Sequence, residues 1–334
     1  MKRSRLLLIS PAYSPQYHPL STHVKGIAEA VLSEESLIQS VFVLLQPSSR
    51  TPDAAKKHEV SNRVQILRPL AKGVRAWLQF YSYLRAVRAD IIHVHGLSIP
   101  LALVLLFIPK CIVILSWQPS AEKRWSKILK APLYKYLLRR RVSQIITSSQ
   151  SLMQSSTLLA AHQSKLQYIS LGTHPRHYPV PESTSAPHGF KRYILVFVEG
   201  KKDAGLSVFL NAIHGLKIPC VVICNTSATP PIEKSEWIRY CRPQSIVELA
   251  TYLCHADFIV DPSLCPSQLS DWSRLWAMLY HRPVLGTAVS MDLPFLVQDG
   301  RSGTLVEPGS VKELRAGIIQ LWDMDADKKT ALGN

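Results

Sequence analysis

Short apolar segments rich in β-branched residues alternate with stretches of helical spacing along the whole 334-residue chain. The first half contains seven of these segments, at residues 5–10, 40–45, 63–67, 90–95, 111–117, 143–149 and 166–170. The second half contains five, at residues 193–200, 220–224, 257–263, 284–289 and 303–308. Strands that are apolar on both faces and alternate with helices are typical of parallel sheets covered by helices on both sides. The pattern therefore predicts an α/β fold with two Rossmann-like, doubly wound parallel-sheet domains.

The length of the chain also indicates more than one domain. A chain of 334 residues with 47% hydrophobic residues exceeds what a single core usually requires. Residues 173–189 contain several prolines and no periodicity, which is typical of a linker. We expect an N-terminal domain at residues 1–172, a linker at 173–190 and a C-terminal domain at 191–334. The ligand of such a protein normally binds at the carboxyl ends of the strands, in the cleft that the two domains face.

The positive charge is concentrated in the first half of the chain. The formal net charge is +16, and residues 1–180 carry 24 Lys and Arg against 7 Asp and Glu. Residues 181–334 carry 15 against 16. Such an asymmetry favours an anionic partner for the N-terminal domain, although an ordinary basic surface explains it as well.

Other sequence signals exclude several classes of protein. The six cysteines form no CxxC pair, and the first residues contain too short an apolar run for a signal peptide, so we expect a reduced, cytoplasmic protein. Residues 101–115 are strongly apolar, but Pro109 and Lys110 divide them into pieces too short to span a membrane. His93 and His95 have no carboxylate or cysteine beside them in the sequence, so we expect no metal site. Without a P-loop or a GxGxxG motif, a nucleotide cofactor of the NAD type is not expected.

Seven motifs follow one another along the chain: "ADIIHVHGL", "SQIITSSQSLMQ", "YISLGTH", "AGLSVFLNAI", "ELATYLCHADFIVDPS", "WAMLYHRPVLGTAV" and "VQDGRSGTLVEPGSVKELRAGI". Their order resembles that of the group 1 retaining glycosyltransferases, which have the GT-B fold. The resemblance covers nearly the whole chain and is most specific over residues 246–319. It implies transfer of a hexose from a nucleotide sugar, bound as a co-substrate by the C-terminal domain, to a glycan or a lipid-linked acceptor with retention of configuration. No other cofactor and no metal are implied.

The chain departs from the family at the positions of the donor site. The resemblance places two family glutamates at Gln268 and Trp276, and a third acid at Phe295. Trp276 cannot accept a hydrogen bond, whereas Gln268 retains a carbonyl acceptor. We expect Asp271 to cap the following helix, where its charge opposes a phosphate. The resemblance assigns no catalytic residue. The candidate donor-binding residues are Gly200, Lys201, Lys202, Gln268, Leu269, Ser270, Asp271 and Trp276.

Each donor candidate also has a purely structural interpretation. Trp272, Trp276 and Leu279 follow the spacing of one helix face, which more often packs into a core than binds a ligand. Lys201 and Lys202 can stabilise the charge of a departing diphosphate or remain an ordinary solvated pair.

On the acceptor side, the resemblance points to the carboxyl ends of the first strands. The glycine pair of the family is replaced by His18 and Pro19, and the histidine expected after residue 117 is Gln118. The acceptor-side candidates are therefore His18, His95 and Gln118. As an alternative, we expect His93 and His95 to be ordinary histidines at a strand end whose hydrogen bonds are satisfied within the protein.

The basic residues of the first half are densest at residues 122–141. An aromatic and apolar stripe bordered by Lys and Arg favours an anionic membrane surface, so we expect a peripheral location on the inner face of the cytoplasmic membrane. The candidate membrane-facing residues are Lys123, Arg124, Trp125, Lys127, Arg139, Arg140 and Arg141. The alternative is a helix that packs into the core and carries its basic residues on the outer side. Nucleic acid is a less favoured partner, because no motif that binds it is present.

Two functions follow from these patterns. The first is a hexosyltransferase that uses a nucleotide sugar. The second is a catalytically silent GT-B subunit that binds an active transferase, a glycan or a lipid. The family usually continues beyond the last motif with a helix that returns to the N-terminal domain, and without it we expect looser domain closure.

Overall fold

The computed structural model describes most of the chain as two compact units, Met1–Gln118 with Glu122–Thr173, and chiefly His174–Asn334. The residues described are 3–13, 19–33, 37–47, 58–61, 63–117, 124–148, 153, 156–172, 189–198, 205–224, 235–264, 268–289, 297 and 299–333. For residues 19, 58–61, 124–130 and 268–270 only the backbone is described. Most of the expected linker, residues 173–188, lies outside these ranges, so the domain boundaries stay a prediction.

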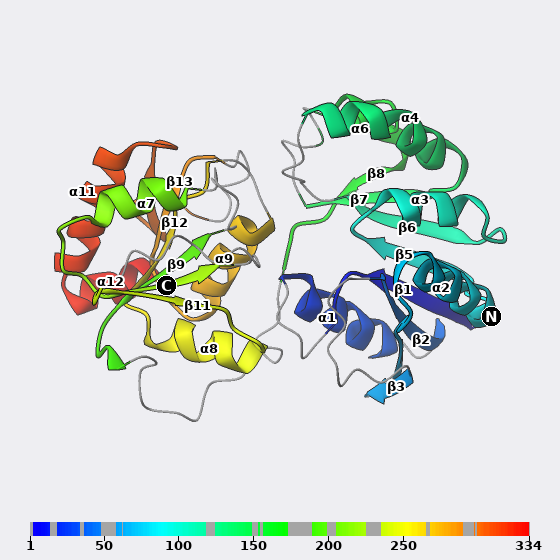
Figure 1. Cartoon of the computed structure of the whole chain (residues 1–334), viewed down its shortest axis with the longest axis horizontal. Coiled ribbons are helices and arrows are strands. Elements are labelled where there is room, and N and C mark those ends of the chain that lie inside the picture. The colour runs from blue at the N-terminus through cyan, green and yellow to red at the C-terminus, as the bar shows by residue number, and fades with distance from the viewer. Residues whose placement is uncertain are drawn as a thin grey trace. The chain divides into compact units, whose positions relative to one another are not determined.

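The first unit is built on an eight-stranded sheet in the order β3-β4-β2-β1-β5-β6-β7-β8 (Figure 1). All neighbouring strands are parallel except β3, which pairs antiparallel with β4 at the edge. The strands are β1 Ser4–Ser10, β2 Ile38–Leu45, β3 His58–Ser61, β4 Val64–Leu67, β5 Ile91–His95, β6 Ile112–Trp117, β7 Gln144–Thr147 and β8 Leu166–Tyr168.

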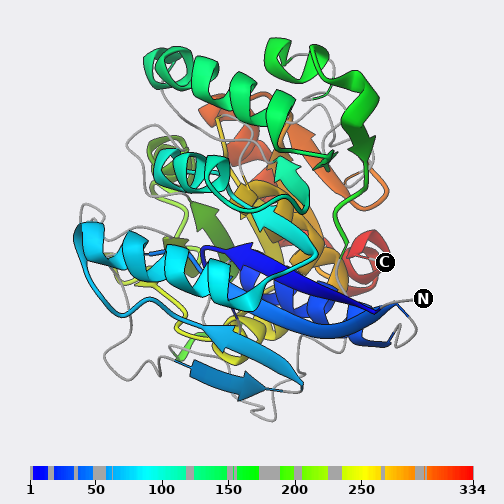
Figure 2. The same cartoon turned by 90° about the vertical axis from the view of Figure 1, so that its right-hand side faces the viewer.

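Helices cover both faces of this sheet. Helix α1 (Pro19–Ser33) packs on one face through a core that contains Val24 and Leu8. On the other face, α2 (Gly73–Val87), α3 (Ile99–Leu106) and α4 (Arg124–Arg140) share a single core, and Figure 2 shows them side by side. Two short elements follow, α6 Thr157–Ala160 and the 3-10 helix η1 Gln163–Lys165.

The second unit has a six-stranded sheet, entirely parallel, in the order β11-β10-β9-β12-β13-β14. Its strands are β9 Ile194–Val198, β10 Cys220–Cys224, β11 Ile238–Cys241, β12 Phe258–Asp261, β13 Val284–Thr287 and β14 Gly303–Val306. Its helices are α7 Leu206–Ile213, α8 Ile246–His255, α9 Gln268–Leu279, α11 Val311–Asp323 and α12 Ala326–Gly333. The central strands β9 and β10 are buried along their whole length, as strands covered on both faces must be.

The predicted α/β fold with two parallel-sheet domains is confirmed. Each of the twelve predicted segments forms a strand, whereas β3 and β11 were not predicted. Both of these strands lie at an edge of their sheet, and "HEVS" and "IRYC" are short and partly polar. A strand that is covered by fewer neighbours does not need a continuous apolar sequence.

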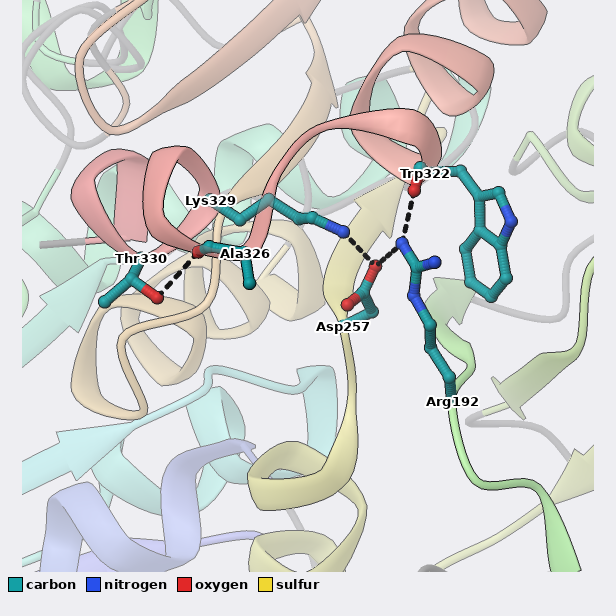
Figure 3. Close-up of polar contacts among 6 residues, drawn as sticks. All are labelled: Arg192, Asp257, Trp322, Ala326, Lys329 and Thr330. Carbon is teal, nitrogen blue, oxygen red and sulfur yellow. Dashed lines mark hydrogen bonds and ion pairs between the residues drawn. The ribbon is translucent and has the colours of Figure 1, made fainter.

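The last helix of the second unit is held by a mostly buried carboxylate. Asp257 Oδ2 accepts hydrogen bonds from Lys329 Nζ on α12 and from Arg192 Nη2 before β9, each at 2.8 Å (Figure 3). The guanidinium of Arg192 also lies 3.8 Å from the centre of the Trp322 ring and donates to the Trp322 carbonyl. Asp257 therefore joins the sheet to α12, and Arg192 extends the connection to α11.

No helix within the described ranges has both the length and the apolar character that crossing a membrane requires.

Candidate functional site

Each sheet has one place where its strand order reverses. In the second unit β9 leads outward to β10 and β11, and the chain then returns to the other side of β9 with β12. In the first unit the same reversal lies between β1 and β5. The loops that leave the carboxyl ends of such a strand pair diverge, which makes this point the usual ligand-binding position of an open parallel sheet.

At the reversal point of the second unit, the two loops approach each other very closely. Gly205 precedes α7 with φ of 87°, and a Cβ atom at this position would lie 1.7 Å from the carbonyl oxygen of Pro262, which follows β12. Only glycine combines this left-handed backbone with so close an approach. Gly205 therefore has a backbone role at this loop contact.

A buried ion pair lies beside this contact. Arg274 Nη2 on α9 is 2.8 Å from Asp261 Oδ2 at the end of β12, and both side chains are almost completely buried. The same guanidinium nitrogen donates to the Thr287 carbonyl at the end of β13, at 3.3 Å. Arg274 Nε and Nη1 have no hydrogen-bond partner among the described residues. Separating the pair would leave an uncompensated charge in the core, so the pair is costly to break. It therefore fixes α9 against β12 and β13.

The ion pair extends into the loop that precedes α9. Asp261 Oδ1 accepts hydrogen bonds from the backbone N–H of Ser263, at 3.3 Å, and from its hydroxyl group. The hydroxyl group of Thr287 donates to the carbonyl oxygen of Ser263. The backbone of residues 261–263 is therefore held by side chains from three elements, and the sequence did not predict this network. The sequence feature that could have indicated this network is Arg274. It places a cation between two tryptophans of the same helix.

Trp276 lies in the core. Its side chain is fully buried, with its ring 5.6 Å from Phe197 on β9 and 6.2 Å from Trp272, measured between ring centres. The core interpretation of Trp272 and Trp276 agrees with this packing, while Leu279 is half-buried. The donor-binding role of Trp276 stays a prediction.

The start of α9 differs from the expectation. The helix begins at Gln268, so Asp271 lies within its first turn, and the prediction that Asp271 is the cap is wrong. Its half-buried carboxylate still lies in the first turn, where the partial positive charge of the helix favours an anion. Gln268, Leu269 and Ser270 are helical, but their side chains are outside the description, as are Gly200, Lys201 and Lys202 in full. Whether these residues bind a donor stays a prediction.

Three histidines gather at the reversal point of the first unit. The ring of His95, the last residue of β5, lies 4.2 Å from the ring of His93 and 5.7 Å from that of His23 on α1, between ring centres. His93 Nε2 hydrogen-bonds to the hydroxyl of Ser116 at 2.8 Å. His95 is completely buried, and neither ring nitrogen has a hydrogen-bond partner among the described residues. The expectation of satisfied histidines is therefore right for His93 and wrong for His95.

Burial keeps these histidines neutral. Desolvation lowers the pKa of His93 to about 4 and that of His95 well below its usual value, and the neighbouring histidines add to both shifts. The pKa of His23 is lowered by the same cause. His95 is completely buried, and its acceptor-side role stays a prediction. His18 and Gln118 lie outside the described residues. No group of histidine, cysteine and acidic side chains in the described ranges has the arrangement of a metal site.

The described part of α4 packs into the core with its basic residues outside. Tyr134, Leu137 and Leu138 are buried, whereas Arg139 and Arg140 are exposed. This is the alternative interpretation of residues 122–141. Lys123 and the side chains of Arg124, Trp125 and Lys127 are outside the description.

Arg141 has a structural role that the membrane-facing prediction missed. Its guanidinium donates to the carbonyls of Leu105, Ile108 and Pro109 at the end of α3, where unpaired carbonyls accumulate. The membrane-facing prediction for Arg141 is therefore corrected to a structural role at the end of α3.

Comparisons with known proteins agree with the resemblance. Residues 192–324 match the family model described as "Glycosyl transferases group 1". No curated protein matches the chain in sequence. Three solved structures illustrate the likeness in fold. Sucrose-phosphate synthase from Thermosynechococcus elongatus is 16% identical, with a TM-score of 0.78 over 99% of this chain and 92% of that one.

The other two structures are more distant in sequence. HepE (Alr3699) from Anabaena, in complex with UDP and glucose, is 14% identical with a TM-score of 0.69, over 99% of this chain and 93% of that one. WaaG, a glycosyltransferase involved in lipopolysaccharide biosynthesis, is 12% identical with a TM-score of 0.65, over 98% and 93%. The chain therefore carries a glycosyltransferase group 1 domain at residues 192–324, and its two units have the Rossmann-like fold of GT-B glycosyltransferases.

Proposed function

We propose that the protein transfers a hexose from a nucleotide sugar to a glycan or a lipid-linked acceptor, with retention of configuration. The observation that carries this proposal is the match of residues 192–324 to the group 1 family, together with the tight loop contact at the carboxyl edge of β9 and β12. HepE, a structural relative that is 14% identical to this chain, is known in complex with UDP and glucose. The basic first half favours an acceptor that is presented at an anionic membrane, reached from the cytoplasm.

In this proposal the second unit holds the donor at the reversal point of its sheet. The network of Asp261, Ser263, Thr287 and Arg274 fixes the loop that leads into α9, and α9 presents Gln268 in its first turn. Lys201 and Lys202 supply positive charge to the departing diphosphate, a role that preorganised cations fulfil in such transfers. Donor affinity is modest, because Trp276 cannot accept the hydrogen bonds that a glutamate would accept.

The second candidate is a catalytically silent subunit that partners an active transferase. The packing of Trp276 favours it, because a fully buried indole between Phe197 and Trp272 offers no surface to a ligand. The carboxylate of Asp271 in the first turn of α9 favours it too, since it repels a phosphate.

Binding of nucleoside diphosphate sugars to the full-length protein separates the two candidates. In calorimetric titrations with UDP- and GDP-hexoses we expect one of them to bind with a Kd in the high micromolar range, since one or two charge-assisted hydrogen bonds of about 1.5–3 kcal/mol each are missing. Lys201→Ser combined with Lys202→Ser should weaken that binding about tenfold or more. The matched control is Lys312→Ser combined with Lys328→Ser, two exposed lysines of the same unit.

Product analysis then tests the reaction itself. Incubation with the bound donor and an acceptor should give a glycoside whose anomeric configuration, measured by NMR, is that of the donor sugar. Absence of binding to every donor, with an intact thermal transition, would contradict the transferase and support the silent subunit.

A further inference from the structure

Helix α3 is apolar on every side. All residues from Ile99 to Pro109 are apolar, and the next residue is Lys110. Leu101, Ala102 and Leu105 face the core of the first unit and are completely buried. A helix without polar side chains is normally covered on all sides, because its side chains cannot form hydrogen bonds with water.

The outer face of α3 is nevertheless exposed. Ile99, Leu103 and Phe107 are 40%, 46% and 74% exposed, and their spacing of four residues places them on one side of the helix. We call these three residues the α3 outer face. On α2, which packs on the same face of the sheet, Val74 and Leu78 are exposed as well. An exposed apolar stripe such as the α3 outer face marks an interaction site.

Cations border the α3 outer face. Tyr81 of α2 donates a hydrogen bond to the Phe107 carbonyl at 3.2 Å, and the guanidinium of Arg85 lies 6.0 Å from the centre of the Tyr81 ring. On the other side, the bonds from Arg141 to the end of α3 bring the end of α4, with exposed Arg139 and Arg140, next to it.

The three helices that form this surface contain no acidic residue. Their ranges are residues 73–87, 99–106 and 124–140. Asp90, which follows α2, accepts a hydrogen bond from the backbone N–H of Arg5 at 2.8 Å, and Glu122, which precedes α4, lies outside the described residues. Figure 2 shows α2, α3 and α4 together on one side of the first unit. The apolar stripe is therefore flanked by helices of one charge sign.

We propose that the α3 outer face docks on an anionic lipid bilayer. Ile99, Leu103 and Phe107 enter the boundary between headgroups and acyl chains, and the cations of α2 and α4 lie against lipid phosphates. An apolar face with Lys and Arg on both sides is the arrangement that binds such a surface. A second copy of the chain is a poorer occupant, because a two-fold contact through this face would oppose cations with cations. Nucleic acid would leave the apolar stripe without a partner.

This docking does not depend on sugar transfer, so it is tested on vesicles alone. The full-length protein is sedimented with vesicles of phosphatidylglycerol and phosphatidylcholine in equal parts, and with vesicles of phosphatidylcholine only. We expect binding to the anionic vesicles that weakens as salt is added. Leu103→Ser combined with Phe107→Ser should weaken it about tenfold or more. Arg139→Ser combined with Arg140→Ser should weaken it about fivefold per residue.

Matched controls lie on the second unit. Val247→Ser removes an apolar side chain that is 55% exposed on α8, and Arg301→Ser with Lys312→Ser removes two exposed cations. These variants should bind the vesicles like the parent. All variants should retain the parent's thermal transition, and the affinity for a nucleotide sugar, measured separately, should not change.

Three results would overturn the proposal. The first is a parent protein that does not bind the anionic vesicles. The second is binding that Leu103→Ser with Phe107→Ser leaves unchanged. The third is a parent that self-associates in analytical ultracentrifugation and becomes monomeric in that double variant without any vesicle binding, which would assign the face to a contact between copies.

Discussion

The side chain of Trp276 occupies a position where the family resemblance places an acid, and the protein uses it to fill the space between α9 and β9. Aromatic residues remove large apolar areas from water, so such a side chain contributes strongly to the core. Trp276 therefore has a packing function at a position where the family has a ligand-binding residue. Its contribution to the free energy of unfolding can be measured.

Replacing this residue with the family's acid should destabilise the fold. Trp276→Glu would bury a carboxylate without a partner and leave a cavity, and we expect the free energy of unfolding to fall by several kcal/mol. Urea denaturation measures the change. Met278→Glu on the same helix is the control, because Met278 is 41% exposed and the new carboxylate would reach water. A Trp276→Glu variant as stable as the parent, with tighter nucleotide-sugar binding, would instead place this residue in the donor site.

At the scale of elements, β5 and α1 meet through neutral histidines at the reversal point of the first sheet. Gln46, which follows β2, donates to the carbonyls of His95 and Gly96 at 3.1 and 2.8 Å, so the loop after β2 holds the end of β5. The rings contribute packing, His93 hydrogen-bonds to Ser116, and His23 hydrogen-bonds to the backbone of Gly172. The contacts among the histidine rings require the imidazoles to be neutral.

The stability of the first unit should consequently depend on pH. Above pH of about 6.5 the histidines are neutral in both the folded and the unfolded chain, so they make no pH-dependent contribution. Below it the unfolded chain binds protons that buried His93 resists until about pH 4, and the free energy of unfolding should fall by about 3 kcal/mol for this residue over that window.

Thermal denaturation between pH 7 and pH 4 measures this effect. His95→Leu, which removes one member of the cluster, should flatten the dependence, while His214→Gln, on an exposed histidine of the second unit, should not. If the stability of the parent protein is constant down to pH 4, the histidines bind protons equally well in the folded and the unfolded chain, which contradicts the prediction.

At the scale of the whole molecule, each unit is built around its own sheet, and the positive charge belongs almost entirely to the first. Cores that each contain a full set of buried strands favour units that remain folded when the chain between them is cut.

Limited proteolysis tests this independence and the predicted linker together. Glu182 is the one glutamate of residues 173–190, so an endoproteinase specific for glutamate should cut after it and give two protease-resistant fragments that retain cooperative thermal transitions. Glu182→Gln should abolish that cut and leave cleavage elsewhere unchanged. Rapid degradation of either fragment would show that its unit does not fold alone.

The sequence by itself determined the architecture, because a strand buried on both faces must be apolar along its whole length. The runs at β1, β9 and β10 satisfy this requirement and were recognisable without any tertiary information. The edge strands β3 and β11 escaped prediction for the same reason, since fewer contacts constrain their side chains. The motif order that indicates the glycosyltransferase group 1 family is likewise a property of the linear chain.

Only the tertiary structure decided which polar residues share an environment. Asp261 and Arg274 are thirteen residues apart on different elements, and nothing local in either segment specifies their 2.8 Å contact. The same holds for Arg141 at the end of α3 and for His95, whose lack of a partner depends on α1 folding over it. Pairing and burial of polar groups are set by how elements pack, because the cost of an unpaired charge or ring nitrogen arises only once water has been excluded.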